Sequence, residues 1–293
     1  MLTDKHVVII GGDARALEII RKLLVLDAKV TLVGFEQLDN GFIGASKKTM
    51  NEVEWPEVDA IIIPVHGTSA DGKVDSFFSD EVIKLTADQL KKTPAHCVVY
   101  SGISNEYLDH CIATSKRTLV KLMDRDDIAI YNSIPTAEGA IMMAIQHMDI
   151  TIHQSKVAVI GLGRVGMSVA RMFAALGANV SVVARKPHHL ARITEMGLKP
   201  FHSSELKKAL HDVDLCINTV PAKIVTANVL AEMPLQALII DLASKPGGTD
   251  FRYAEKRGMK ALLAPSLPGI VAPKTAGQIL ADVLAELIKE IKV

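Results

Sequence analysis

Short runs of apolar residues recur along the first half of the chain, and segments with apolar residues at helical spacing separate them. Such runs, rich in valine and isoleucine, are typical of strands buried on both faces of a parallel sheet. They predict strands at 6–10, 29–33, 59–65, 96–101 and 118–122, with helices ending near 26 and lying near 88–92 and 105–115. The alternation of strands and helices predicts a parallel α/β layer.

The second half repeats the alternation. Strands are predicted at 157–160, 179–184, 214–218, 237–242 and 260–264. A helix follows the first of them and runs to about 176, where Gly177 ends it. We therefore expect an α/β protein with two doubly wound parallel-sheet domains, the second built on six strands.

The domain boundaries follow from two apolar helices. We expect an N-terminal α/β domain on the substrate side at 1–134, an interdomain helix at 135–150, a cofactor-binding domain at 151–274 and a C-terminal helix at 275–293. The interdomain helix is predicted to begin at Pro135. Its apolar face is marked by Ile141, Ala144, Ile145 and Met148.

The C-terminal helix carries an apolar stripe at helical spacing. The stripe consists of Ile279, Val283, Leu287 and Ile291, and Leu280, Leu284 and Ile288 widen it. We expect this helix to pack back on the first domain. A dimer interface is the alternative, so a homo-oligomer stays open.

The glycine motif after the strand at 157–160 is the feature that points to a cofactor. Gly161, Gly163 and Gly166 have the GxGxxG spacing, with a strand before them, a helix after them and a second strand beyond. The first glycine permits a tight turn, the second lets backbone N–H groups approach a pyrophosphate, and the third lets the helix pack closely on the strand. This framing predicts a Rossmann NAD(P)-binding domain, in which Leu162, Arg164 and Val165 also border the dinucleotide.

The residue after the second strand of that domain decides the form of the cofactor. An NAD site usually places Asp or Glu there to bind the ribose hydroxyls, whereas this chain has Arg185 and Lys186. Because a cation favours a 2′-phosphate, we predict NADP; the alternative is that Arg185 is a solvated residue of an NAD enzyme.

Loops at the carboxyl ends of later strands complete the expected cofactor site, because ligands of doubly wound sheets gather at that edge. The residues expected there are Asn218, Thr219, Val220 and Pro221 after one strand, and Asp241 and Ser244 after the next. Asn218 and Thr219 equally fit a simple turn closure.

The first half carries the candidates for binding a small dicarboxylate. They are Arg15, Ser101, Ser104 and Asn105, joined by Lys245 of the second half. Each also has a plain structural role, Ser104 as a helix cap and Arg15 and Lys245 as surface charges. His66 is a candidate proton acceptor or an ordinary loop histidine. The turn at Gly11 and Gly12 lacks the third glycine, and Asp13 would repel a phosphate.

Composition excludes several other classes. The 293 residues include 33 basic and 33 acidic ones, so nothing predicts a nucleic acid or an anionic membrane as partner. We expect no membrane span and a cytoplasmic location. Cys97, Cys111 and Cys216 form no CxxC pair and are expected to be buried thiols. We expect a solvated loop at 124–127 and no metal site, since no His or Cys accompanies its carboxylates.

Several segments resemble the dipicolinate synthase A subunit of endospore-forming bacteria. They are Gly11 to Arg15, Tyr131 to Thr136, Gly161 to Arg164, Asp241 to Ser244, and Ala264 to Gly277. The resemblance covers essentially the whole chain. It implies a role in sporulation in the mother-cell cytoplasm, where the flavoprotein-like B subunit of dipicolinate synthase acts with this one to convert dihydrodipicolinate to dipicolinate (pyridine-2,6-dicarboxylate). It transfers no acid or base, so the catalytic residues stay unknown.

Two other functions stay open at this point. The loop from Asn218 to Pro221 is similar to that of shikimate and amino-acid dehydrogenases, although no Lys–Asp pair is placed for hydroxyl oxidation. The chain also fits a non-catalytic NADP-binding partner of the flavoprotein-like subunit, because a fold and a cofactor site do not prove turnover.

Overall fold

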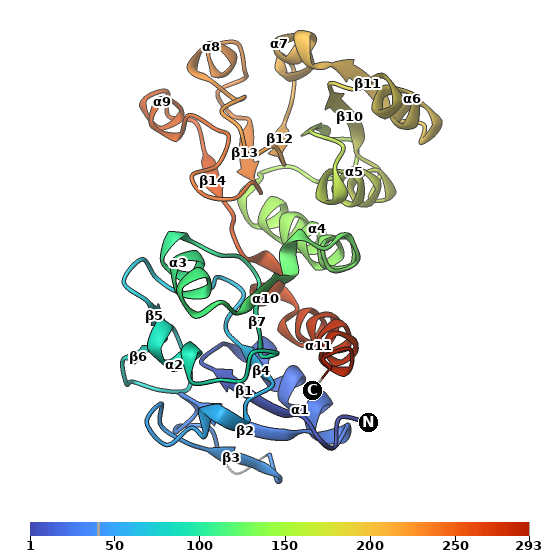
Figure 1. Cartoon of the computed structure of the whole chain (residues 1–293). Coiled ribbons are helices and arrows are strands. Elements are labelled where there is room, and N and C mark those ends of the chain that lie inside the picture. Colours follow the sequence, from blue (N-terminus) through green and yellow to red (C-terminus); the bar gives the residue numbers. More distant parts are fainter. Residues whose placement is uncertain (40–41, 293) are drawn as a thin grey trace. The chain divides into compact units, whose positions relative to one another are not determined.

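Two six-stranded parallel sheets organise the chain in the computed structural model, which describes residues 1–39 and 42–292 (Figure 1). The chain divides into two compact units, Met1–Ala129 with Ala272–Val293, and Ile130–Val271. Each sheet has the strand order of a doubly wound fold, in which the first strand lies centrally and the fourth lies beside it. The predicted fold class is confirmed.

The first sheet has the order β3-β2-β1-β4-β7-β8. Its strands are β1 (His6–Ile10), β2 (Lys29–Val33), β3 (Ala45–Lys47), β4 (Ala60–Ile62), β7 (Val98–Ser101) and β8 (Thr118–Lys121). A separate hairpin pairs β5 (Lys73–Val74) with β6 (Ile83–Lys84). The helices are α1 (Ala14–Val25), α2 (Ala87–Lys91), α3 (Glu106–Ser115) and α11 (Pro273–Lys289), with short 3-10 turns at Trp55–Glu57 and Leu122–Asp124.

Both faces of this sheet are buried, which explains the continuous apolar runs in its strands. In β1, Val7 and Ile9 face one core and Val8 and Ile10 the other, and all four are at most 1% exposed. Helices α1 and α11 cover the first of these faces, and α2 and α3 cover the second.

The last helix differs in detail from its predicted pattern. Its buried line runs through Leu280, Leu284 and Ile288, whereas the predicted stripe is only partly buried. The buried face of α11 differs from the predicted one because a glycine faces α1. A methyl group on Gly277 would lie 2.6 Å from the carbonyl oxygen of Arg15, so α11 lies directly against the backbone of α1.

The second sheet has the order β11-β10-β9-β12-β13-β14. Its strands are β9 (Lys156–Ile160), β10 (Asn179–Ala184), β11 (Lys199–His202), β12 (Leu215–Asn218), β13 (Leu238–Asp241) and β14 (Ala261–Leu263). The helices of this unit are α5 (Arg164–Ala175), α6 (Pro187–Glu195), α7 (Leu206–Leu210), α8 (Ala227–Leu230), α9 (Phe251–Lys256) and α10 (Leu267–Val271), with a 3-10 turn at Ser203–Glu205.

Helix α4 (Asp126–His147) corrects two predictions. It begins well before Pro135, and the expected solvated loop at 124–127 is therefore partly helical. Pro135 lies inside the helix, where the hydroxyls of Ser133 and Thr136 donate to carbonyls of the preceding turn. Ile145 is 67% exposed and does not belong to the buried face.

By length and composition, α4 is the one helix among the described residues that is long and apolar enough to cross a membrane. Those properties alone do not separate a spanning segment from a core helix. Ala137, Ala140 and Ala144 of this helix are fully buried in the core of the second unit.

The three cysteines are free and buried, as predicted. Burial raises the pKa of the Cys216 thiol to about 12 and that of Cys97 to about 11, so neither forms a reactive thiolate near neutral pH.

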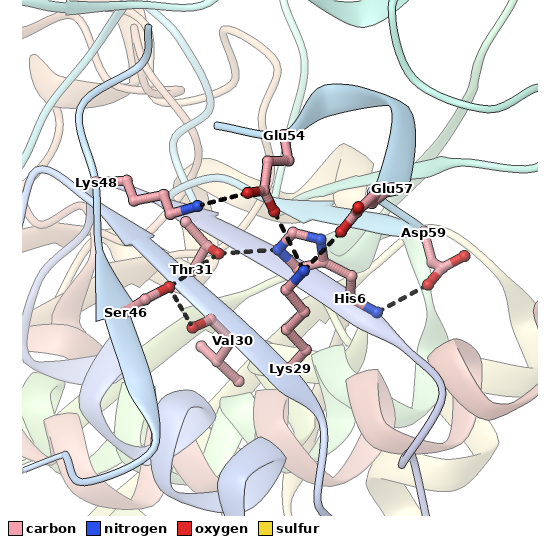
Figure 2. A network of polar contacts seen from close by, with 9 residues as sticks. All are labelled: His6, Lys29, Val30, Thr31, Ser46, Lys48, Glu54, Glu57 and Asp59. Atoms are coloured by element: carbon pink, nitrogen blue, oxygen red, sulfur yellow. Dashed lines mark hydrogen bonds and ion pairs between the residues drawn. The ribbon is translucent and has the colours of Figure 1, made fainter. Parts of the chain in front are cut away.

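A polar network lies within the first unit, around the amino-terminal ends of β1 and β2 (Figure 2). The imidazole Nε2 of His6 is 2.9 Å from the Thr31 hydroxyl, and the side chain is 4% exposed. Its Nδ1 has no hydrogen-bond partner among the residues that the structure describes. The Lys29 ammonium lies beside this ring and pairs with the carboxylates of Glu54 and Glu57. Burial, and then the charge of Lys29, lower the pKa of His6.

This lowered pKa predicts a loss of stability in acid. The unfolded chain takes up a proton on His6 below pH ~6.5, whereas the folded protein resists it, so unfolding becomes easier as the pH falls. We expect the free energy of unfolding to fall by up to about 1.4 kcal/mol per pH unit more steeply in the natural protein than in His6→Gln. Trp55, the only tryptophan, is buried nearby and reports urea unfolding at pH 7.5 and 5.5 by its fluorescence. Equal slopes in both proteins would contradict the prediction.

Candidate functional site

The carboxyl edge of the second sheet gathers the predicted cofactor residues. The switch in strand order lies between β9 and β12, so the loops after these two strands flank the same crevice. The loop after β9 carries the glycine motif, and the loop after β12 begins with Thr219. The Thr219 hydroxyl donates to the carbonyl oxygen of Ile160 at 2.8 Å and joins the two loops.

The three glycines have the geometry that their spacing predicts. Gly161 has a positive φ of 97°, and a methyl group there would lie 2.6 Å from the Thr219 hydroxyl. A methyl group on Gly166 would overlap the carbonyl oxygen of Gly161, so the first turn of α5 is pressed against the strand. At Gly163 a methyl group would meet no heavy atom within 4 Å. The chain itself therefore leaves the space above Gly163 open.

The N-terminus of α5 is equipped for an anion. Gly163 is its N-cap residue and provides no side-chain cap, and the first turn contains no acidic residue. The helix dipole and the free N–H groups of such an end favour a phosphate. The residues present therefore fit a dinucleotide, with its pyrophosphate at Gly163 to Val165. Leu162 is buried beneath the turn and Arg164 is exposed beside it.

Asn218 and Asp241 take a different place from the expected one, since both side chains are fully buried. The Asn218 amide donates to Asp241 at 3.1 Å and to the carbonyl oxygen of Val220 at 3.0 Å. The other donors to Asp241 are the N–H groups of Ala243 and Gly248 and the hydroxyl of Thr249, at 3.0, 2.9 and 2.6 Å. The pair thus locks the loops after β12 and β13 to each other. Gly248 and Thr249 were not among the predicted residues, because their partnership with Asp241 depends on the folded loop.

The outer residues of these loops are accessible. Pro221 and Ser244 are exposed, and Thr219 and Val220 are half-buried at the crevice. Arg185 and Lys186 are exposed directly after β10, and Lys186 is the N-cap residue of α6. Within residues 1–39 and 42–292 the Arg185 guanidinium forms no hydrogen bond or ion pair, so it is available to a ligand.

The corresponding turn of the first unit is filled by the chain itself. The Gly12 N–H donates to the carbonyl oxygen of Asp75 at 2.9 Å, and the Phe77 N–H donates back to Gly12 at 2.9 Å. The Asp13 carboxylate caps α1 by accepting from the Arg15 N–H at 3.0 Å. Helix α5 begins at a glycine that provides no side-chain cap, whereas α1 begins at a carboxylate that caps it and at a paired backbone turn.

The substrate candidates of the first unit are largely engaged in internal contacts. Arg15 is 8% exposed and forms an ion pair with Asp13 at 2.6 Å. Burial works against ionisation of Asp13, but the hydrogen bonds and charge of Arg15 prevail and lower its pKa. The Ser101 hydroxyl donates to the carbonyl oxygen of Ile103 at 2.6 Å, and Asn105 caps α3.

The side chains of the two remaining candidates form no hydrogen bond or ion pair within the described part of the chain. Ser104 is half-buried and, with Asn105 as the residue that caps α3, it has no capping role. Lys245 is exposed on the loop after β13, in the second unit. The structure thus groups Arg15, Ser101, Ser104 and Asn105 at the carboxyl edge of one sheet, and Lys245 belongs to the edge of the other.

Comparison with known proteins adds a family. The chain matches the model of the N-terminal domain of the dipicolinate synthase A subunit over residues 6–123, and the model of the alanine dehydrogenase/PNT C-terminal domain over residues 128–293. It is 62% identical to the dipicolinate synthase A subunit of Bacillus subtilis (strain 168), over 100% of this chain and 98% of that protein.

Solved structures agree with these matches. The crystal structure of the dipicolinate synthase A subunit from Bacillus halodurans is 70% identical, with a TM-score of 0.97 over 99% of both chains. A transhydrogenase from Sinorhizobium meliloti is 15% identical, with a TM-score of 0.67 over 97% of this chain and 94% of that one. An L-alanine dehydrogenase is 16% identical, with a TM-score of 0.60 over 96% and 89%. At such low identity the last two indicate the fold alone.

Proposed function

The chain belongs to the family of dipicolinate synthase A subunits, and from this premise we propose that it is the NADP-dependent oxidoreductase subunit of dipicolinate synthase. Its second unit is a dehydrogenase-type NAD(P)-binding domain. The reaction that we propose is oxidation of dihydrodipicolinate to dipicolinate. It would occur in the mother-cell cytoplasm of a sporulating bacterium, together with the flavoprotein-like B subunit.

The main observation behind this proposal is the open space above Gly163, at the N-terminus of α5. Gly163 to Val165 would hold the pyrophosphate, and Thr219 and Val220 would border the rest of the dinucleotide in the crevice. When bound, the nicotinamide would supply an acceptor for the hydride that the dihydropyridine ring loses. The task of the chain is then to bind and orient the ring, because aromatisation itself supplies driving force.

The proposal is tested by supplying dihydrodipicolinate and NADP⁺ to the purified chain, with and without the second subunit. We expect NADPH formation and the absorbance of dipicolinate in step with each other, and their loss in Gly163→Val. Turnover that requires the second subunit and is unaffected by Gly163→Val would show instead that this chain is a non-catalytic partner.

The preference for NADP rests on Arg185 and Lys186. Replacing Arg185 with aspartate removes a charged donor and adds a charge that repels a 2′-phosphate. We expect NADP⁺ to bind about 10- to 100-fold more weakly, with NAD⁺ relatively favoured, as measured by calorimetry. Arg192→Asp is the matched control, because Arg192 is an exposed arginine of α6 that pairs with Glu195. Equal affinity of the natural protein for both nucleotides would show that Arg185 does not select the phosphate.

A further inference from the structure

A histidine and a carboxylate meet at the carboxyl edge of the first sheet. The Nε2 atom of His66 lies 3.3 Å from the Asp75 carboxylate, and the His66 side chain is 48% exposed. His66 follows β4, and the switch in strand order of this sheet lies between β1 and β4. This is the edge at which ligands of doubly wound sheets bind.

The backbone around His66 is tightly held. His66 lies in a turn that the Gly67 N–H closes by donating to the carbonyl oxygen of Pro64 at 2.9 Å. The Ile103 N–H donates to the carbonyl oxygen of Val65 at 3.0 Å and ties this turn to the loop after β7. A methyl group on Gly67 would lie 2.9 Å from the carbonyl oxygen of Ile103, so the two loops are in close contact. The imidazole is therefore exposed, while these contacts hold the backbone that carries it.

Hydrogen bonds to the turns after β1 and β2 hold the backbone around Asp75. Its carbonyl oxygen accepts from the Gly12 N–H in the turn after β1, and the Ser76 hydroxyl donates to the carbonyl oxygen of Gly34 after β2. The segment that carries Asp75 is thus anchored on two strand ends. Its side chain is 73% exposed, and among the described residues its carboxylate pairs with His66 and with no lysine or arginine.

The other charged groups here are Asp13 and Arg15. Burial works to raise the pKa of Asp13, but the hydrogen bonds and charge of Arg15 lower it, and the charge of His66 adds a smaller effect in the same direction. Arg15, Pro64, Val65 and Gly102 line one small cavity of about 30 Å³, so Arg15 and the two residues before His66 border the same space. Residues 102–105 of the loop after β7 bring no titratable side chain.

We propose that His66 is the catalytic base of this chain and that Asp75 is its positioning residue. This inference rests on the proposed function. The Asp75 carboxylate accepts from Nε2–H, which leaves the lone pair of Nδ1 for the substrate. Oxidation of the ring removes a hydride from one ring carbon, which a bound nicotinamide would accept, and a proton from the neighbouring ring carbon, which His66 takes. The electron pair of that second C–H bond forms the new ring double bond, and the imidazolium passes its proton to water.

The test compares His66→Gln with His110→Gln, a matched change at an exposed histidine of α3. We expect kcat to fall about 100-fold or more in His66→Gln, with loss of the acidic limb of its pH profile, and partial rescue by added imidazole. Asp75→Asn should lower kcat less than His66→Gln, because the imidazole remains and only its orientation by the carboxylate is lost. His110→Gln should behave as the natural protein.

A second measurement does not depend on turnover. Addition of dipicolinate to the full chain should shift the Cε1–H NMR signal of His66, assigned by its loss in His66→Gln, and leave that of His110 in place. If the natural protein oxidises dihydrodipicolinate but His66→Gln stays within threefold of it with an unchanged acidic limb, the inference is overturned and the proposed function stands. If the natural protein forms no NADPH, the proposed function fails.

Discussion

Gly163→Val is expected to abolish dinucleotide binding and to leave the fold intact. A Cβ atom at this position meets no heavy atom of the described residues within 4 Å, its chain neighbours apart, so we expect the substitution to cost little packing energy. It would fill the space in which backbone N–H groups approach a pyrophosphate. We expect the affinity for NADP⁺ to fall at least about 100-fold, which corresponds to about 2.7 kcal/mol, with a melting temperature within a few degrees of the natural protein.

The measurements are calorimetric titration with NADP⁺ and thermal unfolding of the same samples. Gly197→Ala is the control for nucleotide affinity, since the residue lies after α6, outside the glycine turn, and an added methyl group meets no heavy atom of the described residues within 4 Å. Its positive φ of 73° strains an alanine, so this variant is not a control for the melting temperature. If Gly163→Val retained its affinity for NADP⁺, the glycine turn at 161–166 would be excluded as the nucleotide site.

Asp241→Ala is expected to cause the largest loss of stability. The carboxylate accepts four hydrogen bonds while fully buried. Its removal leaves three donors, the N–H groups of Ala243 and Gly248 and the Thr249 hydroxyl, without this acceptor, and leaves the Asn218 amide with Val220 alone. Each buried donor left unpaired costs about 1–3 kcal/mol. Because such costs do not add fully, we expect about 4 kcal/mol in the free energy of unfolding.

Chemical denaturation followed by circular dichroism measures this loss, and faster hydrogen exchange at 243–249 would locate it. Asp241→Asn retains one acceptor oxygen and should lose less. Asp212→Ala removes a carboxylate that is 73% exposed and should change stability by no more than about 0.5 kcal/mol. An unfolding free energy of Asp241→Ala close to that of Asp212→Ala would mean that the loops are held by other contacts.

Strands with strong local signals are readable from the sequence. The predicted strands at 6–10, 29–33 and 179–184 coincide with β1, β2 and β10, because valine and isoleucine fill both of their faces. The sixth strand of the second sheet, β11, could not be located in this way. Its sequence is Lys-Pro-Phe-His, in which Phe201 alone is buried, and its position at the sheet edge requires no apolar run.

The beginning of α4 shows how a local rule misleads. Proline usually marks the first turn of a helix, and the prediction placed the start at Pro135 for that reason. The helix starts at Asp126 and continues through the proline, because the tertiary packing of Ala137 and Ala140 outweighs one lost hydrogen bond.

Part of the candidate site could be predicted from the sequence, and part of it depends on contacts that only the fold creates. The roles of the glycines depend on neighbours close in sequence, so their spacing predicts the geometry at Gly161, Gly163 and Gly166. The pairing of Asn218 with Asp241 joins two strand ends, and the contact of Gly12 with Asp75 joins residues far apart in the chain. Neither leaves a periodic signal, and both became visible only with the fold.

The turn after β1 in the first unit is occupied by other residues of the chain, and this bears on how many dinucleotides one molecule can bind. Two halves with one strand order present two equivalent places for a nucleotide, yet Asp75, Phe77 and the carboxylate of Asp13 already occupy the donors and acceptors of one of them. We therefore expect a single molecule to carry one equivalent of coenzyme, in its second unit, which leaves the corresponding edge of the first unit to the other reactant.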